Sequence, residues 1–534
     1  METLFIIILS LCMAALLKTL FNLLFPSIST PMLTKTKAKK LPPGPSMVPI
    51  IGNLLWLRKS FSELEPILRN MYTKYGPLVT IRSGSRPAIL IANHSLAHQA
   101  LIQNSAVFAD RPAALPVVRI FSSNQHNVSS AAYGPTWRLL RRNLTSKILH
   151  PSQVKSYSHA RSRVLRILVD LLKNQSRLGE PVRVFKHFQY AMFCLLVFMC
   201  FGDELEEKQI KDIEAVQRKL LLSVSRFNIL NFWPRLGKIL FRNRWKELMQ
   251  LRKCQEDVLI PLIRARMKAK LETHLCKNAQ NEEDKEEFVI SYVDTLMNLQ
   301  LPGEKRELNE GEMVSLCLEF LNAGTDTTST ALQWIMANLV KYPRVQEKLF
   351  AEINGVLTGK LGGKRVEEVK EEDLQKMPYL KAVILEGLRR HPPAHFVMSH
   401  AVTEDVELNG YVVPKSATVN FMVAEMGQDP KVWDNPMVFE PERFLSVSCG
   451  GEVFDITGSR EIKMMPFGAG RRMCPGYGLA MFHLEYFVAN LVWQFEWKAW
   501  GGEEVDLSEK HEFTIVMKCP LRANLSPRVR DLTG

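Results

Sequence analysis

Apolar residues recur at spacings of three and four along most of the chain, which is the period of an α-helix that buries one face. Pro343 and Pro392 each stand just beyond such a segment, where a residue without a backbone N–H ends the helical pattern. The pattern predicts helices over Glu206–Ser225, Trp245–Cys276, Glu310–Lys341, Val345–Leu357 and Leu374–Arg390.

Strand signals are fewer than helix signals. Residues 78–92 are rich in strand formers on both sides of Gly84-Ser85, and the two halves of the segment 406–413 flank Asn409-Gly410. Asn-Gly suits a type I′ hairpin turn, in which both central residues take positive φ. We find no internal repeat and no further domain boundary, so the body of the chain is predicted to be mainly α with a small β portion.

The start of the chain favours a membrane anchor. Residues 4–25 are mostly apolar, with Ser10, Lys18-Thr19 and Asn22 as interruptions, and a stretch of this length is enough to cross a bilayer. A cleaved signal peptide is the alternative, although no basic residue precedes the apolar stretch. We expect residues 1–26 to form one uncleaved transmembrane helix.

The residues after this stretch predict its orientation. Four lysines between residues 35 and 40 form a one-sided basic excess, which keeps the following part of a chain in the cytosol. Five Asn-x-Ser/Thr sequons would instead suit a lumenal, glycosylated body. Leu41-Pro42-Pro43-Gly44-Pro45 excludes a helix, so we expect residues 27–52 to be a basic and proline-rich hinge before a body over residues 53–534.

Composition narrows the class of protein. The chain of 534 residues is 46% apolar and 23% charged, which excludes wholesale disorder. Nine cysteines in so long a chain favour a reducing compartment over a disulfide scaffold. The formal net charge of +14 favours an anionic membrane surface or an acidic protein partner. We expect no nucleic-acid partner, since the chain has neither an arginine-rich tail nor zinc-finger spacing.

The sharpest chemical signal is a glycine-framed cysteine just before the apolar helical run from Leu479 to Val492. It lies in Phe467-Gly468-Ala469-Gly470-Arg471-Arg472-Met473-Cys474-Pro475-Gly476. Glycines let the backbone approach a flat ligand closely, and the start of a helix stabilises a thiolate. One thiolate is the wrong count for a structural zinc site and the right count for an axial haem ligand. A buried free cysteine in a glycine loop is the alternative.

This loop resembles the haem-ligating signature of the cytochrome P450 superfamily, Phe-x-x-Gly-x-Arg-x-Cys-x-Gly. The signature is complete at Phe467, Gly470, Arg472, Cys474 and Gly476. The resemblance implies a cytochrome P450 fold behind a single N-terminal transmembrane helix, with haem b held by Cys474 as the iron ligand. It gives the other four residues a role in binding the cofactor.

A second segment supports the resemblance. Ala323-Gly324-Thr325-Asp326-Thr327-Thr328 lies inside the long predicted helix 310–341, where glycine and threonine are poor helix formers. Their hydroxyls can bond back to carbonyls one turn earlier. Taken alone, such a segment is more often a packing feature. Beside the cysteine loop it resembles the family's oxygen-binding groove, which implies that Asp326 and Thr327 relay protons as catalytic residues.

Two further motifs match the family. Glu386 and Arg389 on one predicted helix, with Arg443 in Pro441-Glu442-Arg443-Phe444, resemble its structural Glu-Arg-Arg triad. Trp137 and Arg141, one helical turn apart, resemble its donors to a haem propionate.

The sequence departs from the family at one position. The family often has an arginine as a further propionate donor in the strand after the equivalent of His391-Pro392-Pro393, and here the matching residue is His400. We assign His400 to cofactor binding, with a solvated strand residue as the alternative.

The resemblance implies a monooxygenase that inserts one atom of O2 into an organic substrate, and the layout is most similar to plant microsomal members. Electrons are then expected from a separate NADPH-cytochrome P450 reductase in the endoplasmic reticulum membrane, because no Gly-x-Gly-x-x-Gly motif is present. A haem-thiolate isomerase or dehydratase that needs no reductase, and a haem sensor without enzymatic activity, are the alternatives.

By the same resemblance, several mostly apolar segments line the substrate pocket, which fits a lipophilic or amphipathic substrate. These are Pro112–Ser130, Val224–Phe241, Phe320, Asn322, Ala323, Phe396–Met398 and Phe513–Val516. An aromatic and basic segment, Phe227–Trp245, suits either an interfacial membrane contact or a packed core helix.

Overall fold

The computed structural model describes residues 10, 13–14, 16–18, 40–45, 61–83, 86–231, 234–277, 289–358, 366–415, 417–445 and 453–528. The chain separates into two compact units, Met1–Leu41 and Pro42–Gly534. Residues 10, 13–14 and 16–18 of the first unit are helical. Most of the predicted anchor, the lysines before residue 40, most of the hinge and the Gly84-Ser85 turn lie outside the described residues.

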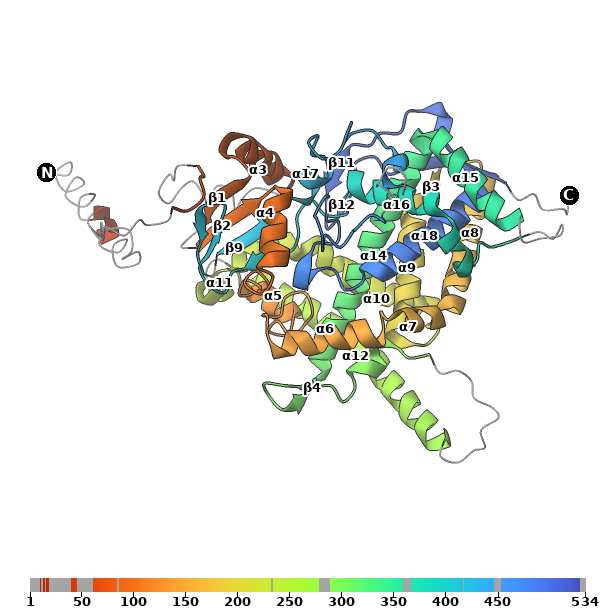
Figure 1. Ribbon diagram of the computed structural model, residues 1–534. Coiled ribbons are helices and arrows are strands. Elements are labelled where there is room, and N and C mark those ends of the chain that lie inside the picture. The colour runs from red at the N-terminus through yellow and green to blue at the C-terminus, as the bar shows by residue number, and fades with distance from the viewer. Residues whose placement is uncertain are drawn as a thin grey trace. The chain divides into compact units, whose positions relative to one another are not determined.

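The second unit is mainly helical, and strands β1, β2 and β9 lie beside α3 and α4 (Figure 1). Its α-helices are α3 (Phe61–Tyr75), α4 (His94–His98), α5 (Pro116–Phe121), α6 (Pro135–Lys147), α7 (Pro151–Ser156), α8 (Ser158–Arg177), α9 (Val184–Phe201), α10 (Glu207–Ser223), α11 (Pro234–Leu240), α12 (Arg242–Lys277), α13 (Tyr292–Leu296), α14 (Glu310–Lys341), α15 (Pro343–Thr358), α16 (Pro378–Arg390), α17 (Val423–Gly427) and α18 (Tyr477–Gln494). Short 3-10 or π segments are η2 (Gln99–Gln103), η3 (Val224–Asn231), η4 (Glu371–Lys376), η5 (Pro441–Phe444), η6 (Gly470–Arg472) and η7 (Trp500–Gly502).

Four of the five predicted helices are confirmed as α10, α12, α14 and α15, and the apolar run after the cysteine loop is confirmed as α18. The fifth, predicted from Leu374, is wrong at its start. A separate 3-10 turn, η4, ends at Lys376, and α16 begins at Pro378. Pro378 has no N–H to continue the earlier turn, but it fits the first position of a new helix.

Helix α14 runs through the helical part of the unit (Figure 1) and packs against α9, α16 and α18. A capping box starts it: the Asn309 side chain accepts from the Glu312 N–H at 2.9 Å, and Glu312 accepts from the Asn309 N–H at 2.8 Å. Most of its 32 residues are buried. A helix that is buried all round fixes the position of every side chain that it presents to a site.

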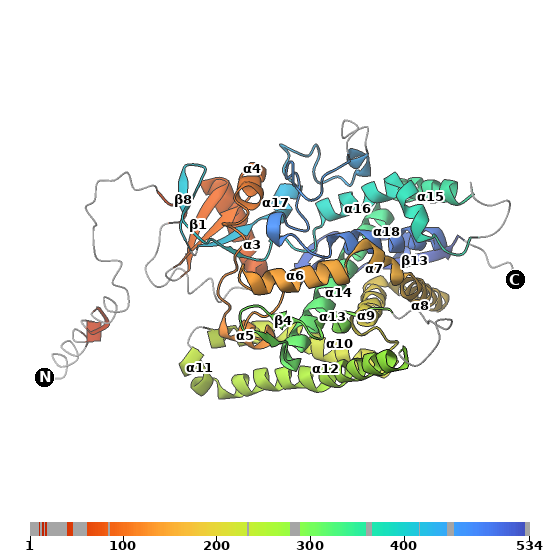
Figure 2. The ribbon, with the colours of Figure 1, turned by 60° about the horizontal axis from the view of Figure 1, so that its bottom comes forward.

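Helix α9 is the one helix among the described residues that is long and apolar enough to cross a membrane. Two-thirds of it is buried inside the unit, between α8 and α14. It ends at Gly202, whose φ of 76° suits glycine. Here α9 is therefore a core helix, and α12 with α10 beside it flanks the same region (Figure 2).

The predicted strands are confirmed. A four-stranded sheet has the order β1 (Leu78–Ser83), β2 (Arg86–Ile91), β9 (Thr418–Phe421) and β6 (His400–Ala401), with only β2 and β9 parallel. The hairpin of β7 (Val406–Leu408) and β8 (Tyr411–Val413) turns at Asn409 and Gly410, whose φ values of 52° and 77° fit a type I′ turn. The other strands are β3 (Val182–Arg183), β4 (Gln300–Leu301), β5 (Arg306–Glu307), β10 (Phe495–Ala499), β11 (Glu509–His511), β12 (Ile515–Met517) and β13 (Arg522–Pro527).

The proline segment packs on the edge of this sheet. The Thr80 N–H donates to the Pro43 carbonyl at 2.8 Å. A Cβ at Gly44 would lie 1.9 Å from the Thr80 carbonyl oxygen, so only glycine allows this approach.

Two hydrophobic cores meet at the cysteine loop. The larger one surrounds α14 and includes Leu479, and the smaller one covers the sheet and includes Met465 and Ala469. The loop is therefore held from both sides.

Candidate active site

Cys474 lies in the turn between η6 and α18. Its N–H donates to the Phe467 carbonyl at 2.9 Å, and Gly476 caps the N-terminus of α18. Burial raises the pKa of the Cys474 thiol, and the Gly476 N–H and the Arg141 guanidinium oppose that rise. The N–H at the start of a helix that the sequence led us to expect near this sulfur is present, Arg141 adds a charge that was expected only at a propionate, and iron would add the largest positive charge.

Gly470 sets how closely the loop approaches its neighbours. Its φ is 71°, and a Cβ there would lie 2.0 Å from the Leu101 carbonyl oxygen. Gly468, with φ of 69°, makes the preceding bend. Gly470 therefore excludes a side chain, which explains this glycine of the signature, and Gly468 is favoured by its positive φ alone.

Three arginines gather beside the loop. Arg472 donates to the carbonyls of Ala109 at 2.6 Å and Ala131 at 2.7 Å, and Arg141 donates to the Met473 carbonyl at 2.7 Å. Burial, together with repulsion from Arg111 and Arg141, lowers the pKa of Arg472 to about 9. The cluster therefore concentrates positive charge in a buried place, which an anionic group would stabilise.

Trp137 on α6 completes this cluster. The guanidinium of Arg472 lies 4.3 Å from the centre of its ring, and that of Arg141 lies 5.5 Å away. Among the described residues, the buried Nε1 of Trp137 has no hydrogen-bond partner. A buried N–H without a partner costs about 1–3 kcal/mol, and an adjacent carboxylate would remove that cost. These residues fit a haem propionate.

His400 lies in β6 and is only 4% exposed, so the alternative of a solvated strand residue is wrong. Its Nδ1 donates to the Phe108 carbonyl at 2.6 Å. Burial lowers the pKa of His400 to about 3, with Arg111 and Arg472 acting in the same direction. The imidazole is therefore neutral here and adds no formal charge to the arginine cluster.

Asp326 and Thr327 lie in the middle of α14. The Gln189 amide on α9 donates to Asp326, and the Arg218 guanidinium on α10 lies 4.0 Å from the same carboxylate oxygen. Burial raises the pKa of Asp326 against both contacts. The Thr327 hydroxyl donates back to the Ala323 carbonyl at 2.6 Å, as the threonine run predicts, and α14 continues without a break.

Glu386, Arg389 and Arg443 come together. Both carboxylate oxygens of Glu386 accept from Arg389 at 2.7 Å, and Nε of Arg443 lies 3.3 Å from one of them. Arg389 also donates to the carbonyls of Gly427 and Pro436 at 2.7 and 2.8 Å. The group ties α16 to the segment that leads to the cysteine loop.

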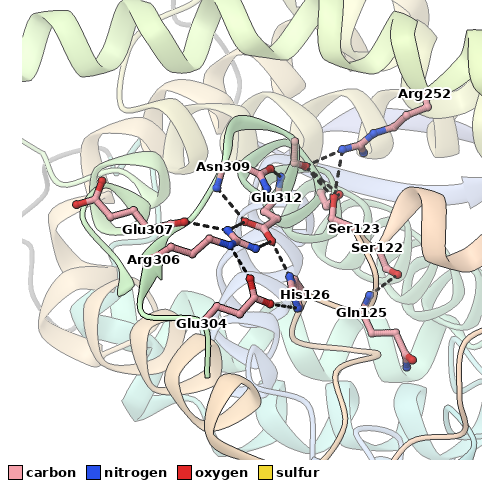
Figure 3. A network of polar contacts seen from close by, with 12 residues as sticks. Ser122, Ser123, Gln125, His126, Arg252, Glu304, Arg306, Glu307, Asn309 and Glu312 are labelled. Atoms are coloured by element: carbon pink, nitrogen blue, oxygen red, sulfur yellow. Dashed lines mark hydrogen bonds and ion pairs between the residues drawn. The ribbon is translucent and has the colours of Figure 1, made fainter. Parts of the chain in front are cut away.

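A polar network fixes the segment Pro112–Ser130 against the start of α14 (Figure 3). Nδ1 of His126 lies 2.6 Å from Glu312, and Arg306 donates to both oxygens of that carboxylate at 2.7 Å. Further along α14, Glu319 accepts from the N–H groups of Val128 and Ser129 at 2.8 and 2.7 Å. The contacts of His126 and Arg306 with Glu312 border a polar cleft of about 590 Å³.

Two other segments expected at the pocket are also held in place. The Thr514 hydroxyl lies 2.8 Å from that of Thr330 on α14, and the Trp334 indole donates to the Ile515 carbonyl at 2.7 Å. Arg111 donates to the carbonyls of Met398 and Ser399 at 2.6 and 2.8 Å. The Phe396–Met398 and Phe513–Val516 segments are thus fixed relative to α14 and the arginine cluster.

Sequence reasoning missed two polar residues of this region. Arg111 is half-buried against backbone carbonyls, and its only local signal is its place between Asp110 and Pro112. Gln189 sits in the apolar helix α9, 137 residues before Asp326. A lone amide in an otherwise apolar helix was the available signal for Gln189, because a buried amide needs a partner.

Comparisons with known proteins agree on one family. Residues 42–525 match the family described as Cytochrome P450. Cytochrome P450 89A9 of Arabidopsis thaliana is 51% identical over 92% of this chain and 94% of its own length. Flavonoid 3'-monooxygenase of the same plant is 30% identical over 92% of both chains. A solved zebrafish cytochrome P450 with abiraterone covers 87% of this chain and 99% of its own at a TM-score of 0.67 and 21% identity, which shows the same fold.

Proposed function

Because the chain belongs to the cytochrome P450 family and is a haem-thiolate monooxygenase, we propose that it oxygenates a lipophilic or amphipathic organic substrate with electrons from an NADPH-dependent reductase. The observation that carries the proposal is Cys474 at the start of α18, beside a buried arginine cluster and an unpartnered Trp137 indole. The family implies a redox partner, a substrate and O2, and it implies haem with a cysteine thiolate ligand.

We assign haem b to this site. Cys474 would hold the iron, Phe467, Gly470 and Gly476 would shape the loop beneath the macrocycle, and the propionate side would meet Trp137, Arg141, Arg472 and His400. When bound, the haem supplies reductive activation of dioxygen, in which one oxygen atom enters the substrate and the other leaves as water.

A prediction for the propionate site concerns haem retention. Trp137→Phe removes one N–H donor to a carboxylate, a bond worth about 1.5–3 kcal/mol, while the ring stays. We expect haem transfer to apomyoglobin to become about 10-fold to 100-fold faster. Trp500→Phe in η7 is the control and should transfer haem at the original rate. Equal rates in all three proteins would mean that Trp137 does not bind a propionate.

Asp326 and Thr327 are the residues that could move protons at this site. Asp326 is held between Gln189 and Arg218, and burial raises the pKa of its carboxyl, so it takes up a proton more readily than an exposed aspartate does. Thr327 places a hydroxyl beside it on the same helix. We propose that this pair delivers protons to bound oxygen.

Replacement of Thr327 by valine tests the relay. Thr327→Val keeps the volume and deletes the hydroxyl, so we expect product per NADPH oxidised to fall about 10-fold or more, with hydrogen peroxide taking its place. Thr325→Val is the matched control, because the Thr325 hydroxyl makes the same bond back along α14, at 2.7 Å from the Leu321 carbonyl. An unchanged ratio in Thr327→Val would leave the threonine run as a packing feature.

The electron source distinguishes this proposal from its alternatives. NADPH oxidation should depend on both the substrate and an added diflavin reductase, and compounds that bind should shift the Soret band of the haem. An isomerase or dehydratase would turn over without reductase. A haem sensor would bind haem and show no substrate-dependent NADPH oxidation.

We further propose an endoplasmic reticulum location, with residues 1–26 as anchor, 27–52 as hinge and 53–534 in the cytosol. Ile239 and Leu240 of α11 are 75% and 68% exposed beside Lys238, which suits a second membrane contact, whereas Phe227 is buried in the core.

Protease protection tests this topology. Protease outside sealed microsomes should digest the body, and no sequon should carry glycan. Deletion of residues 1–40 should release the protein only in part. A protected, glycosylated body would reverse the orientation.

A further inference from the structure

Two histidines and two glutamates from distant parts of the chain meet in the interior of the Pro42–Gly534 unit. Glu65 lies on α3, His395 follows α16, and Glu509 and His511 lie on β11, which contacts α3 (Figure 1). Nδ1 of His395 lies 2.7 Å from one oxygen of Glu65, and Nε2 of His511 contacts the other oxygen. Glu65 and His395 are 3% and 2% exposed. One donor atom from each of these three residues lies within 4.8 Å of the others.

A second carboxylate faces the outer side of the same imidazole. Nε2 of His395 lies 3.3 Å from Glu509, whose other oxygen lies 3.3 Å from Nδ1 of His391. The His391 ring is stacked on Trp334, with the ring centres 4.0 Å apart. A histidine that binds a metal through one nitrogen generally turns its other N–H to a carboxylate, which orients the ring. His395 stands in this relation to Glu65 and Glu509.

The carboxylates of this cluster outnumber the arginines that face them. Glu65, Glu425 and Glu509 are three carboxylates, Arg69 lies 2.7 Å from both Glu65 and Glu425, and the charge of Arg390 acts on Glu509. Burial lowers the pKa of His391 to about 4, so that imidazole is neutral. A divalent cation would offset the remaining negative charge, and so would a proton on His395.

We propose that Glu65, His395 and His511 bind a zinc ion, with Glu509 orienting His395. Two imidazole nitrogens and a carboxylate form a common zinc donor set, whereas calcium and magnesium prefer oxygen donors throughout. Donor atoms around a tetrahedral zinc lie about 3.3 Å apart, so the 2.7 Å contact needs to open by less than 1 Å.

Such an ion would join α3 to two segments that are expected to line the pocket. His395 directly precedes Phe396, His511 precedes Phe513 by two residues, and the Ile515 N–H donates to the Pro393 carbonyl at 2.9 Å. Zinc would therefore fix the two segments against each other. An effect on substrate binding rests on the proposed function, but zinc binding itself does not.

The metal content of the full-length, haem-loaded protein tests the proposal. After removal of any metal-binding tag, we expect one zinc per chain in addition to haem iron. His395→Gln and His511→Gln should each lose the zinc, and His159→Gln, at an exposed histidine on α8, should keep it. Glu509→Gln should weaken zinc affinity about 10-fold to 100-fold in competition with a chromophoric chelator. The ferrous–CO band should be unchanged in every variant, which shows that the haem site is intact.

X-ray absorption at the zinc edge keeps the test decisive if a histidine variant does not fold. The unmodified protein should show two imidazole nitrogens and at least one oxygen at about 2.0–2.2 Å. Zinc retained by both histidine variants, or a sulfur-rich zinc environment, would overturn the proposal.

A zinc-free protein whose unfolding temperature does not respond to added zinc chloride would also overturn it, and would point to a protonated His395. Burial lowers the pKa of His395, but Glu509 and Glu65 outweigh it and raise the value to about 9. The contribution of the His395 proton to the free energy of unfolding is fully present below about pH 6.5 and is lost as the pH rises through about 9. Such a loss in zinc-free protein would identify an ion network in place of a metal site.

Discussion

Replacement of Cys474 by serine is expected to abolish both monooxygenation and the strongly red-shifted ferrous–CO band of a thiolate-ligated haem. A serine hydroxyl stays protonated at neutral pH and donates far less electron density to iron than a thiolate does. The backbone of the loop should survive, because the Cys474 N–H still donates to Phe467 and Gly470 still meets Leu101. The measurement is the ferrous–CO difference spectrum together with product formation.

Cys519 provides the matched control for this change. It is a free and exposed cysteine near the end of the chain, so Cys519→Ser should keep both the band and the activity. Retention of the red-shifted band in Cys474→Ser would show that another residue ligates the iron. Loss of the band in both variants would show only that the preparation is unstable, and titration of total haem by the pyridine haemochrome method separates these cases.

The sequence was most informative where local chemistry decides the structure. The capping box of Asn309 and Glu312 sets the first residue of α14, and Pro343 lies just beyond its last turn. Asn409 and Gly410 set the turn between β7 and β8, because both take a positive φ. The glycines of the cysteine loop predicted a close backbone approach, and at Gly470 the neighbour is the Leu101 carbonyl. Each of these predictions depends on residues within a few positions of one another.

Features that depend on distant residues could not be predicted in the same way. Asp326 meets Gln189 from 137 positions away, and His395 meets Glu65 from 330 positions away. The burial of His400 follows from its place between strands and the Phe108 segment, which no local pattern encodes. Helix α9 was not predicted as a separate element, because apolar residues on all its faces hide the helical period.

The second large expected effect is a loss of stability when the triad of Glu386, Arg389 and Arg443 is broken. Glu386 and Arg389 have fully buried side chains, and Glu386 also accepts from the Glu440 N–H at 2.8 Å. Glu386→Gln keeps the shape but removes the negative charge, and leaves Arg389 buried without a counter-ion. Breaking a buried ion pair by removing one partner costs about 3–5 kcal/mol. We expect the free energy of unfolding in urea to fall by that amount.

Two comparison variants make the expectation specific to the triad. Glu207→Gln breaks an exposed pair with Lys211 on α10 and should leave the free energy of unfolding unchanged within error. Nε of Arg443 lies 3.3 Å from Glu386, and Arg443→Lys keeps a positive charge near that carboxylate but loses the planar guanidinium. Its loss of unfolding free energy should fall between those of Glu386→Gln and Glu207→Gln.

Arg389 also donates to the carbonyls of Gly427 and Pro436. Haem loss from Glu386→Gln should therefore accelerate, because the segment before Cys474 becomes less firmly held. Equal stability of Glu386→Gln and Glu207→Gln would mean that packing around α16, and not this charge group, holds the segment in place.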